Sequence, residues 1–196
     1  SHWQADRRFK GRSVIRVLSV AKSLNNELGR TYITGTARGT VEDSAPRKLA
    51  AILAADVAGY SRLMGQDEEA TVRTLSVYRT AIGEVVTTHE GRVFGGAGDS
   101  LVAEFSSPVQ AVRCALAVQE HIATQNKELA EDRRMSFRIG VNLGDVIVDG
   151  ENLLGDGVNV AARLEGLAPP GGICVSAAVF DQVRNRIDAP TSDLGR

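Results

Sequence analysis

Residues 93–105 have the sequence VFGGAGDSLVAEF, in which a glycine-rich turn separates two short apolar runs. A phosphate-binding P-loop would end in Gly-Lys followed by Ser or Thr, whereas Gly98 is followed by Asp99 and Ser100. A dinucleotide-binding loop would continue into a helix, but residues 101–105 have the apolar pattern of a strand. The stretch therefore predicts a β-hairpin with Asp99 at its tip.

The segment before the hairpin predicts a buried strand followed by a helix. Residues 48–57 (KLAAILAADV) form a continuous apolar run that includes only one acid, Asp56, near its end, as expected of a central strand. Residues 67–91 predict a helix, because acidic residues fill the first turn and a glycine follows the end. The apolar residues that recur at helical spacing, and are expected to face the core, are Val72, Leu75, Ile82 and Val86.

The segment after the hairpin predicts a second helix and further strands. Residues 106–129 predict a helix that Ser107 caps and in which a proline takes the first position. Residues 135–150 predict a pair of strands, with turns at Gly144 and Gly150. The remaining expected elements are a helix at 155–168, a strand at 172–176 and a helix at 177–187.

The order of the first six elements is β-α-β-β-α-β, with further strands and helices added. This order predicts an α+β fold with a ferredoxin-like core, in which a sheet containing antiparallel strands carries its helices on one face. In such a core the first strand and the first hairpin are neighbours in the sheet. Asp56 and Asp99 are therefore expected to meet at one end of the sheet.

Two acids at one end of a sheet indicate a cation site. Carboxylates a few ångströms apart repel each other unless a cation lies between them. Mg²⁺ accepts carboxylate and phosphate oxygens, and a pair of such ions supports displacement at phosphorus. Backbone N–H groups in the turn after the first strand could hold a polyphosphate. This turn consists of Ala58, Gly59, Tyr60 and Ser61. The alternative is that Asp56 and Asp99 are unrelated surface acids.

A second candidate group lies on the helix predicted at 155–168. Asn159 and Arg163 are four residues apart and therefore share one face of this helix. An amide beside a guanidinium suits binding to a ribose and to a charged pentavalent phosphorus. The alternative is that the pair belongs to a solvated helix face.

The composition describes a globular protein with little overall charge. The chain has 196 residues, of which 43% are hydrophobic, and its 23 Lys and Arg nearly balance its 24 Asp and Glu. This balance argues against nucleic acid as a partner, and no apolar run approaches the roughly 20 residues of an integral membrane segment. Cys114 and Cys174 lie in apolar contexts and are expected to be buried, reduced thiols of a cytoplasmic protein.

Charge is uneven along the chain, and this asymmetry divides it into two parts. Residues 1–38 contain eight Lys or Arg but only two Asp or Glu. We therefore expect a basic N-terminal arm and linker at 1–46, followed by one domain at 47–196. Within the arm, residues 12–24 (RSVIRVLSVAKSL) predict a basic amphipathic helix, which could be solvated, pack on a partner or lie on a membrane surface.

Four segments, in this order and spacing, resemble the catalytic domain of class III adenylate and guanylate cyclases. They are LAADVAGYSRLM (53–64), GRVFGGAGDSLVAEF (91–105), RIGVNLGDVIV (138–148) and LLGDGVNVAARLE (153–165). The resemblance covers about residues 47–190 and is close to the stand-alone cyclases of bacteria, those of alphaproteobacteria in particular.

The resemblance implies a role for each candidate residue. By this resemblance Asp56 and Asp99 hold two Mg²⁺ or Mn²⁺ ions, with the carbonyl of Val57 helping, and the turn of residues 58–61 receives the phosphates. Asn159 would orient the ribose and Arg163 would stabilise the transition state. The family acts as a head-to-tail dimer, so the metal-binding acids and the Asn/Arg pair of one site would come from different protomers of a homodimer.

The chain departs from the family at the positions that contact the purine. Family members that bind adenine have a lysine four residues before the second metal aspartate, where this chain has Gly95. Their second purine-contacting residue is often an aspartate, where this chain has Asn152, whose amide still carries a donor and an acceptor. The family's last strand, with a phosphate-binding lysine, would follow Arg196, so we expect the domain to be truncated at its C-terminus.

The leading interpretation is a cytoplasmic adenylate cyclase that makes 3′,5′-cyclic AMP and pyrophosphate from ATP for intracellular signalling. One alternative is a guanylate cyclase that uses GTP by the same mechanism. The other is a catalytically silent module for nucleotide binding and dimerisation.

Overall fold

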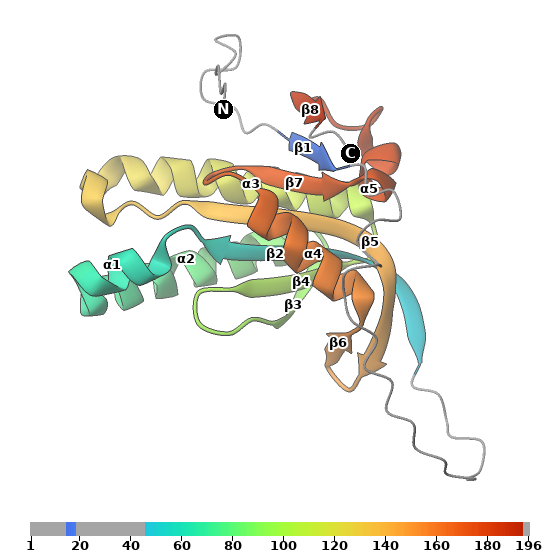
Figure 1. Cartoon of the computed structure of the whole chain (residues 1–196), viewed down its shortest axis with the longest axis horizontal. Coiled ribbons are helices and arrows are strands. Elements are labelled where there is room, and N and C mark those ends of the chain that lie inside the picture. Colours follow the sequence, from blue (N-terminus) through green and yellow to red (C-terminus); the bar gives the residue numbers. More distant parts are fainter. Residues whose placement is uncertain (1–14, 19–45, 194–196) are drawn as a thin grey trace.

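The computed structural model describes residues 15–18 and 46–193, and its centre is one β-sheet (Figure 1). Within the described residues this sheet has eight strands in the order β3-β4-β2-β5-β7-β1-β8, and β6 pairs with β5. The strands are β1 (Ile15–Leu18), β2 (Arg47–Val57), β3 (Gly91–Gly95), β4 (Leu101–Phe105), β5 (Phe137–Asp149), β6 (Asn152–Leu154), β7 (Ile173–Ser176) and β8 (Thr191–Asp193). The helices are α1 (Tyr60–Gln66), α2 (Glu68–Thr88), α3 (Pro108–Gln125), α4 (Asp156–Leu167) and α5 (Ala177–Val183), with short 3-10 turns η3 (Asn126–Glu128) and η4 (Glu131–Arg133).

The elements β2-α2-β3-β4-α3-β5 form the ferredoxin-like core that the sequence predicts. Their strands lie in the order β3-β4-β2-β5, and each neighbouring pair is antiparallel. β2 has a paired strand on both edges and is buried on both faces over most of its length, which explains its continuous apolar sequence. The predicted α+β fold class is therefore confirmed.

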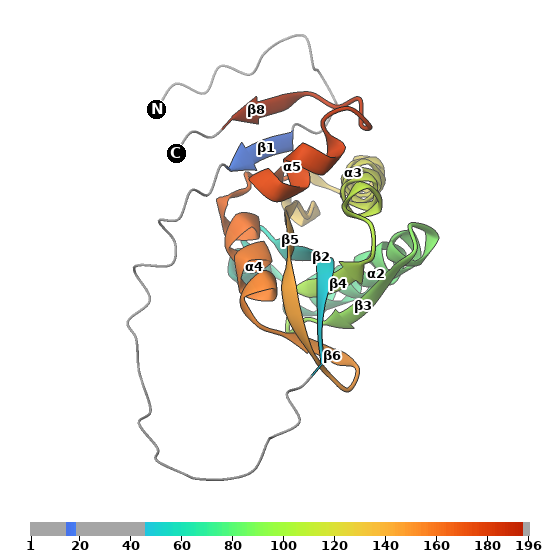
Figure 2. The same ribbon diagram turned by 90° about the vertical axis from the view of Figure 1, so that its right-hand side faces the viewer.

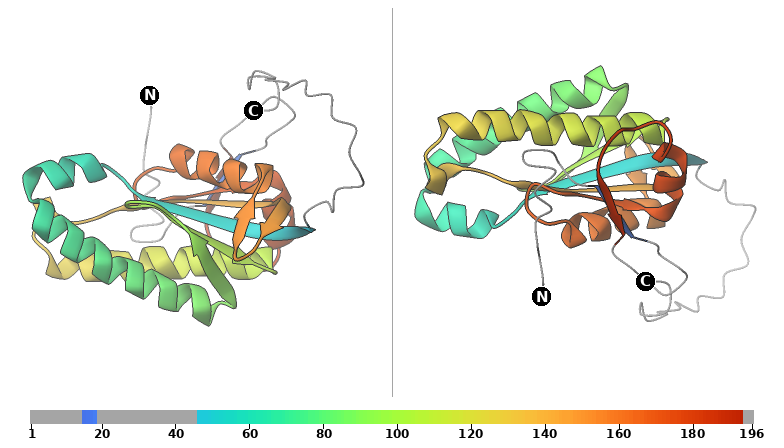
Figure 3. Two further views of the ribbon diagram at one scale, coloured as in Figure 1. Left: turned by 90° about the horizontal axis from the view of Figure 1, so that it is seen from below. Right: turned by 90° about the horizontal axis from the view of Figure 1, so that it is seen from above.

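Helices cover both faces of the sheet, so the expectation of helices on one face only was wrong. α2 and α3 pack on one face, and α4 lies on the other (Figures 2 and 3). Successive side chains of β2 alternate between these layers, because Leu53 joins the large core under α2 and α3 while Ile52 packs with Ala161 of α4. Local helical periodicity shows that a helix has an apolar face, but not which face of the sheet receives it.

α3 begins after its predicted cap, Ser107, and α2 begins after Asp67, which the sequence analysis placed in the first turn of the helix and not at its cap. The carboxylate of Asp67 accepts a hydrogen bond from the N–H of Ala70 at 3.0 Å, and the hydroxyl of Ser107 accepts one from Gln110 at 3.4 Å. Three of the four predicted core residues of α2 are buried. The fourth, Val72, is 49% exposed, so its assignment to the core was wrong.

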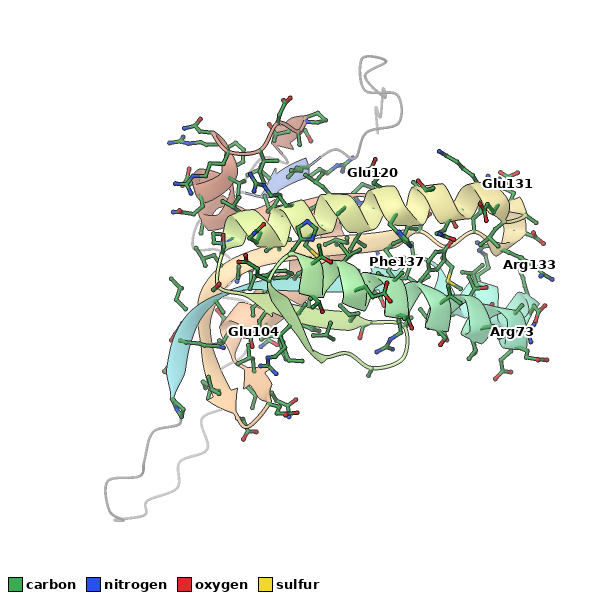
Figure 4. All side chains as sticks on the ribbon, turned by 180° about the vertical axis from the view of Figure 1, so that it is seen from behind. Arg73, Glu104, Glu120, Glu131, Arg133 and Phe137 are labelled. Carbon is green, nitrogen blue, oxygen red and sulfur yellow. The ribbon has the colours of Figure 1, made fainter. Side chains whose placement is uncertain are left out.

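Figure 4 views the molecule from the side that α2 and α3 cover, with Phe137 of β5 beneath these helices. The rings of Tyr78 and Phe137 pack edge to face with their centres 6.0 Å apart. The Tyr78 hydroxyl donates to Oδ1 of Asn126 at 2.9 Å, and Asn126 donates in turn to the Met135 carbonyl. A buried phenol thus has a hydrogen-bond partner, and the end of α3 is fixed to the start of β5.

The two cysteines are buried and unpaired, as predicted. Burial raises the pKa of the Cys114 thiol to about 12 and that of Cys174 to about 11. Both thiols are therefore neutral at physiological pH and act as small apolar side chains.

β5 is one continuous strand of 13 residues, so the turn predicted at Gly144 was wrong. The turn at Gly150 is confirmed, because Gly150 has φ 58° and connects β5 to β6. Gly144 has a different role: a Cβ at this position would lie 3.1 Å from the Cα of Gly157 in α4. The sequence alone does not distinguish a glycine that permits close packing from a glycine that permits a turn.

β1 shows that the sheet includes a piece of the predicted N-terminal arm. Ile15–Leu18 lie between β7 and the edge strand β8 (Figure 2), and β1 pairs in parallel with both, for example through Ile15 and Ile173 of β7. The predicted amphipathic helix was therefore wrong at these four residues, and its remaining residues lie outside the described part of the chain. Alternating Ile and Val with basic residues between them suit a strand with one buried face as well as they suit a helix.

Ile15→Ala is expected to lower the free energy of unfolding by about 2–5 kcal/mol, the usual cost of such a truncation in a packed core. Ile15 is only 1% exposed and belongs to the large core. The matched control is Leu49→Ala, because Leu49 is 68% exposed. Chemical denaturation monitored by circular dichroism measures both, and equal small losses in the two variants would show that β1 contributes nothing to stability.

Candidate active site

Asp56 and Asp99 lie together at one end of β2. Asp56 is the penultimate residue of β2, and the pairing of Ala55 with Leu101 brings the β3–β4 turn alongside it. The pKa of Asp99 is raised, first by burial and then by a hydrogen bond to Asp56 and by the negative charge of Asp56, although backbone hydrogen bonds, one of them from Val57, partly oppose the rise. The structure thus brings together the two acids and the backbone of Val57.

The glycines before Asp99 shape the turn that presents it. Gly96 and Gly98 have positive φ values of 129° and 61°, and a Cβ on Gly96 would collide with the carbonyl of Ser100. The Ser100 hydroxyl holds the turn by accepting from the Ala97 N–H at 3.0 Å and donating to the Ala97 carbonyl at 2.9 Å. The glycine-rich stretch is therefore a tight turn and not a phosphate loop.

Arg79 of α2 hydrogen-bonds to the same turn between β3 and β4. Its Nη1 atom donates to the carbonyl of Gly98, directly before Asp99, at 2.6 Å. No sequence pattern indicates this contact, because the two residues are distant in the chain and arginine is common on helix surfaces.

The acid pair suits a divalent cation. Two carboxylates in contact supply hard oxygen ligands, and the burial of Asp99 and its neighbour Asp56, which raise the pKa of Asp99, disfavour the ionised form that a divalent cation would stabilise. No group of three or more His, Cys, Asp or Glu residues within the described ranges, 15–18 and 46–193, could hold a metal ion. Any cation here would therefore complete its shell with backbone carbonyls, water or a bound phosphate.

The turn at residues 58–61 connects β2 to α1. Gly59 caps α1 in the left-handed conformation with φ 73°, and Tyr60 and Ser61 begin the helix. The N–H of Ala58 donates to the Ser136 carbonyl at 2.8 Å, so this amide is already used. Phosphate binding by the turn remains a prediction that concerns residues 59–61 more than Ala58.

Two charged residues that the sequence analysis did not select extend from the acid pair: Arg138 contacts Asp56, and Glu165 contacts Arg138. Arg138 of β5 donates from Nη2 to Oδ2 of Asp56 at 3.0 Å. Its Nε atom lies 3.0 Å from Oε1 of Glu165 in α4, an ion pair whose two atoms are buried and not aligned as a hydrogen bond. Burial raises the pKa of Glu165, while the charge of Arg138 opposes this rise. A basic residue at the start of an apolar strand, with an acid after a buried helix face, was the signal available in the sequence.

α4 lies close to β5 because small residues line the contact. A Cβ on Gly140 of β5 would collide with the backbone of Ala161 and Glu165. The side chain of Asn142, two residues further along the same face, donates to the Gly157 carbonyl at 3.1 Å. These contacts fix where α4 crosses the sheet and therefore where its side chains lie.

Asn159 and Arg163 of α4 are exposed and half-exposed, respectively. Among the hydrogen bonds and ion pairs of the described residues, none joins either of them to Asp56 or Asp99. The single chain therefore does not assemble the predicted Asn/Arg pair and the acids into one site.

The two residues predicted to contact the purine base, Gly95 and Asn152, lie on neighbouring segments. Gly95 ends β3 at a bulge, and no atom lies within 4 Å of where its Cβ would be. Asn152 begins β6 and is exposed. Arg92 of β3 connects these segments by donating to the Glu151 carbonyl at 2.8 Å.

None of the helices in the described ranges is both long enough and apolar enough to cross a membrane.

Comparison with known proteins identifies the family. Residues 43–193 match the family described as "Adenylate and Guanylate cyclase catalytic domain". The chain is 48% identical over 155 residues to "Putative adenylate cyclase 3" of Rhizobium meliloti (strain 1021), an alignment that covers 79% of this chain and 26% of that protein. This chain thus spans only about a quarter of the length of that relative.

Solved structures give the same answer for the fold. A crystal structure of "Adenylate/Guanylate Cyclase/Hydrolase" from Silicibacter pomeroyi is 39% identical, with a TM-score of 0.72 over 77% of this chain and 88% of that chain. The adenylyl cyclase CyaB from P. aeruginosa, at 20% identity, shares the fold with a TM-score of 0.65 over 73% of this chain and 84% of that chain. The family match, the relative and the fold agree with one another, and the chain belongs to the adenylate and guanylate cyclase catalytic domain family, class III.

Proposed function

We propose that this chain is the catalytic domain of a purine nucleotide cyclase that uses two Mg²⁺ or Mn²⁺ ions to convert ATP into 3′,5′-cyclic AMP and pyrophosphate. The observation that carries the proposal is the contact between Asp56 and Asp99, whose mutual repulsion a divalent cation would relieve. In the reaction the ribose 3′-oxygen bonds to the α-phosphorus, the bond to the β-phosphate oxygen breaks, and the proton passes to water or to a substrate phosphate.

Each residue of the site has a proposed task. Asp56, Asp99 and the Val57 carbonyl would hold the cations, which when bound increase the acidity of the 3′-hydroxyl and offset phosphate charge. Asn159 would hydrogen-bond the ribose and so hold its hydroxyl in line with the phosphorus. The guanidinium of Arg163 would donate to the oxygens that gain negative charge in the transition state.

We propose that the working unit is a head-to-tail homodimer. Asn159 and Arg163 are turned to the surface of the single chain, and no contact of the described residues joins them to the acids. The sheet face that carries Asp56 is only partly covered, because Phe94 and Val102 at its β3–β4 side are half-buried. A second copy related by a two-fold axis would cover these apolar side chains and bring its Asn/Arg pair to the acids.

The product would serve intracellular signalling, and the buried free thiols suit the reducing cytoplasm, where ATP is abundant. The decisive experiment is incubation of the protein with ATP or GTP and Mn²⁺, followed by chromatography for cyclic nucleotide and pyrophosphate. Cyclic AMP formed faster than cyclic GMP supports the proposal. The reverse order indicates a guanylate cyclase, and absence of both products with retained nucleotide binding indicates a silent module.

The purine contact can be tested at its two positions. Asn152→Ala is expected to weaken ATP use by about 1–3 kcal/mol, the cost of leaving a buried polar group of the base unpaired. Gly95→Lys is expected to fold normally, since the Cβ position is open, and to raise the ratio of ATP to GTP turnover by supplying a donor for an adenine nitrogen. Steady-state kinetics with both nucleotides measures this ratio. A ratio that moves with neither substitution would mean that other residues bind the base.

A further inference from the structure

We infer that Arg138, held in turn by Glu165, is a positioning residue that orients the Asp56 carboxylate for divalent-cation binding. The inference rests on the proposed function, because it concerns the same acid pair. Asp56 and Arg138 are direct partners across the antiparallel strands β2 and β5, so both side chains leave the sheet on the face that α4 covers.

The bond between Arg138 and Asp56 fixes one half of the carboxylate. Nη2 of Arg138 donates to Oδ2 of Asp56 at 3.0 Å. A charge-assisted hydrogen bond to one oxygen restricts rotation of the carboxylate, so the direction of the other oxygen is restricted as well. In metal sites such outer contacts orient the ligand and sustain affinity, although they never touch the metal.

Glu165 holds Arg138 in place. Its Oε1 lies 3.0 Å from Nε of Arg138, and the two side chains are 14% and 30% exposed. A partly buried guanidinium with acids on two sides has one favoured position between them. Glu165 reaches this position because Gly140 lets the backbone of α4 approach β5 without a side chain between them.

The net charge of the site distinguishes two ways in which Arg138 could affect cation binding: by orienting Asp56 or by its positive charge alone. Asp56, Asp99 and Glu165 carry three negative charges when ionised and Arg138 carries one positive charge, which Glu165 balances. Loss of Arg138 alone makes the site more negative, so electrostatics alone predicts tighter cation binding. Loss of orientation predicts weaker binding, and the two explanations therefore differ in sign.

The main test is a double variant that leaves the net charge unchanged. Arg138→Met combined with Glu165→Gln removes one charge of each sign, so neither partner is left as an unpaired buried ion. Binding of Mn²⁺ is measured from the loss of the free-ion electron paramagnetic resonance signal, and turnover is measured in parallel. We expect Mn²⁺ affinity and kcat each to fall about 10–100-fold, the usual effect of losing an outer contact of a metal ligand, with KM for the nucleotide little changed.

Two further variants complete the design. Arg138→Lys keeps the charge but presents a single ammonium in place of two separated N–H groups, so it is expected to recover part of the Mn²⁺ affinity. It also serves as the test if the double variant does not fold. The matched control is Arg73→Met with Glu69→Gln, an exposed ion pair on α2 whose loss should leave both readouts unchanged.

Each outcome is decisive. Wild-type Mn²⁺ affinity and kcat in a folded double variant would show that the network is only structural and would overturn the inference. Tighter Mn²⁺ binding by Arg138→Met alone would overturn it in favour of electrostatics. Absence of Mn²⁺ binding by the unsubstituted protein would instead overturn the proposed function, and the inference with it.

Discussion

Asp99→Asn is expected to slow cyclisation at least about a hundredfold, the scale of loss when a main electrostatic stabiliser is removed from an active site. The amide keeps the size of the side chain but removes its negative charge, and with it the strongest reason for a cation to bind beside Asp56. The rate of cyclic nucleotide formation at saturating Mn²⁺ measures the effect. A variant that retains near wild-type turnover under these conditions would remove Asp99 from the metal site.

Asp99→Asn is expected to lower activity without lowering the stability of the fold. The pKa of Asp99 is raised in the folded protein, so above that pKa its ionisation disfavours the folded state, and this cost disappears as the pH falls and the group binds a proton. A neutral amide is therefore expected to leave the free energy of unfolding at neutral pH unchanged or slightly higher. Asp181→Asn on α5, an exposed aspartate, is the control for general effects of charge removal.

The features that the sequence predicted correctly are those that nearby residues determine. The apolar run of β2, the cap Ser107 and the glycines around Asp99 each specify local geometry without reference to distant parts of the chain. The contact between Asp56 and Asp99 followed from these elements, because the order of a ferredoxin-like core makes β2 and β4 neighbours.

The features that the sequence did not predict depend on contacts between distant segments. β1 joins the sheet through Ile15 and Val17, which pair with β7 residues more than a hundred positions away. Gly144 marks the close passage of α4 and not a turn, a distinction that only the packed structure makes. Arg138 and Glu165 are ordinary charged residues in the sequence and become a network only where β5 and α4 cross.

The shared site of the proposed dimer gives the second large effect. Asp99→Ala and Arg163→Ala are each expected to abolish nearly all turnover, since one would remove the proposed cation ligand and the other the proposed donor to the transition state. In a head-to-tail dimer each protomer gives its acids to one site and its Asn/Arg pair to the other. A mixed dimer of the two variants would therefore have one intact site and one doubly damaged site.

The mixture of these two inactive proteins is expected to recover about a quarter of wild-type activity. Random subunit exchange between equal amounts makes half of the dimers mixed, and each mixed dimer has half of its sites intact, which the two-fold symmetry requires. A mixture of Asp99→Ala with Asp56→Ala is the matched control, because both variants damage the same side of the site and no arrangement restores it. Exchange is verified by differently tagged subunits that co-purify. If exchange is complete and the Asp99/Arg163 mixture stays as inactive as the control, the acids and Arg163 do not act in one shared site, and the dimer cannot be the catalytic unit proposed here.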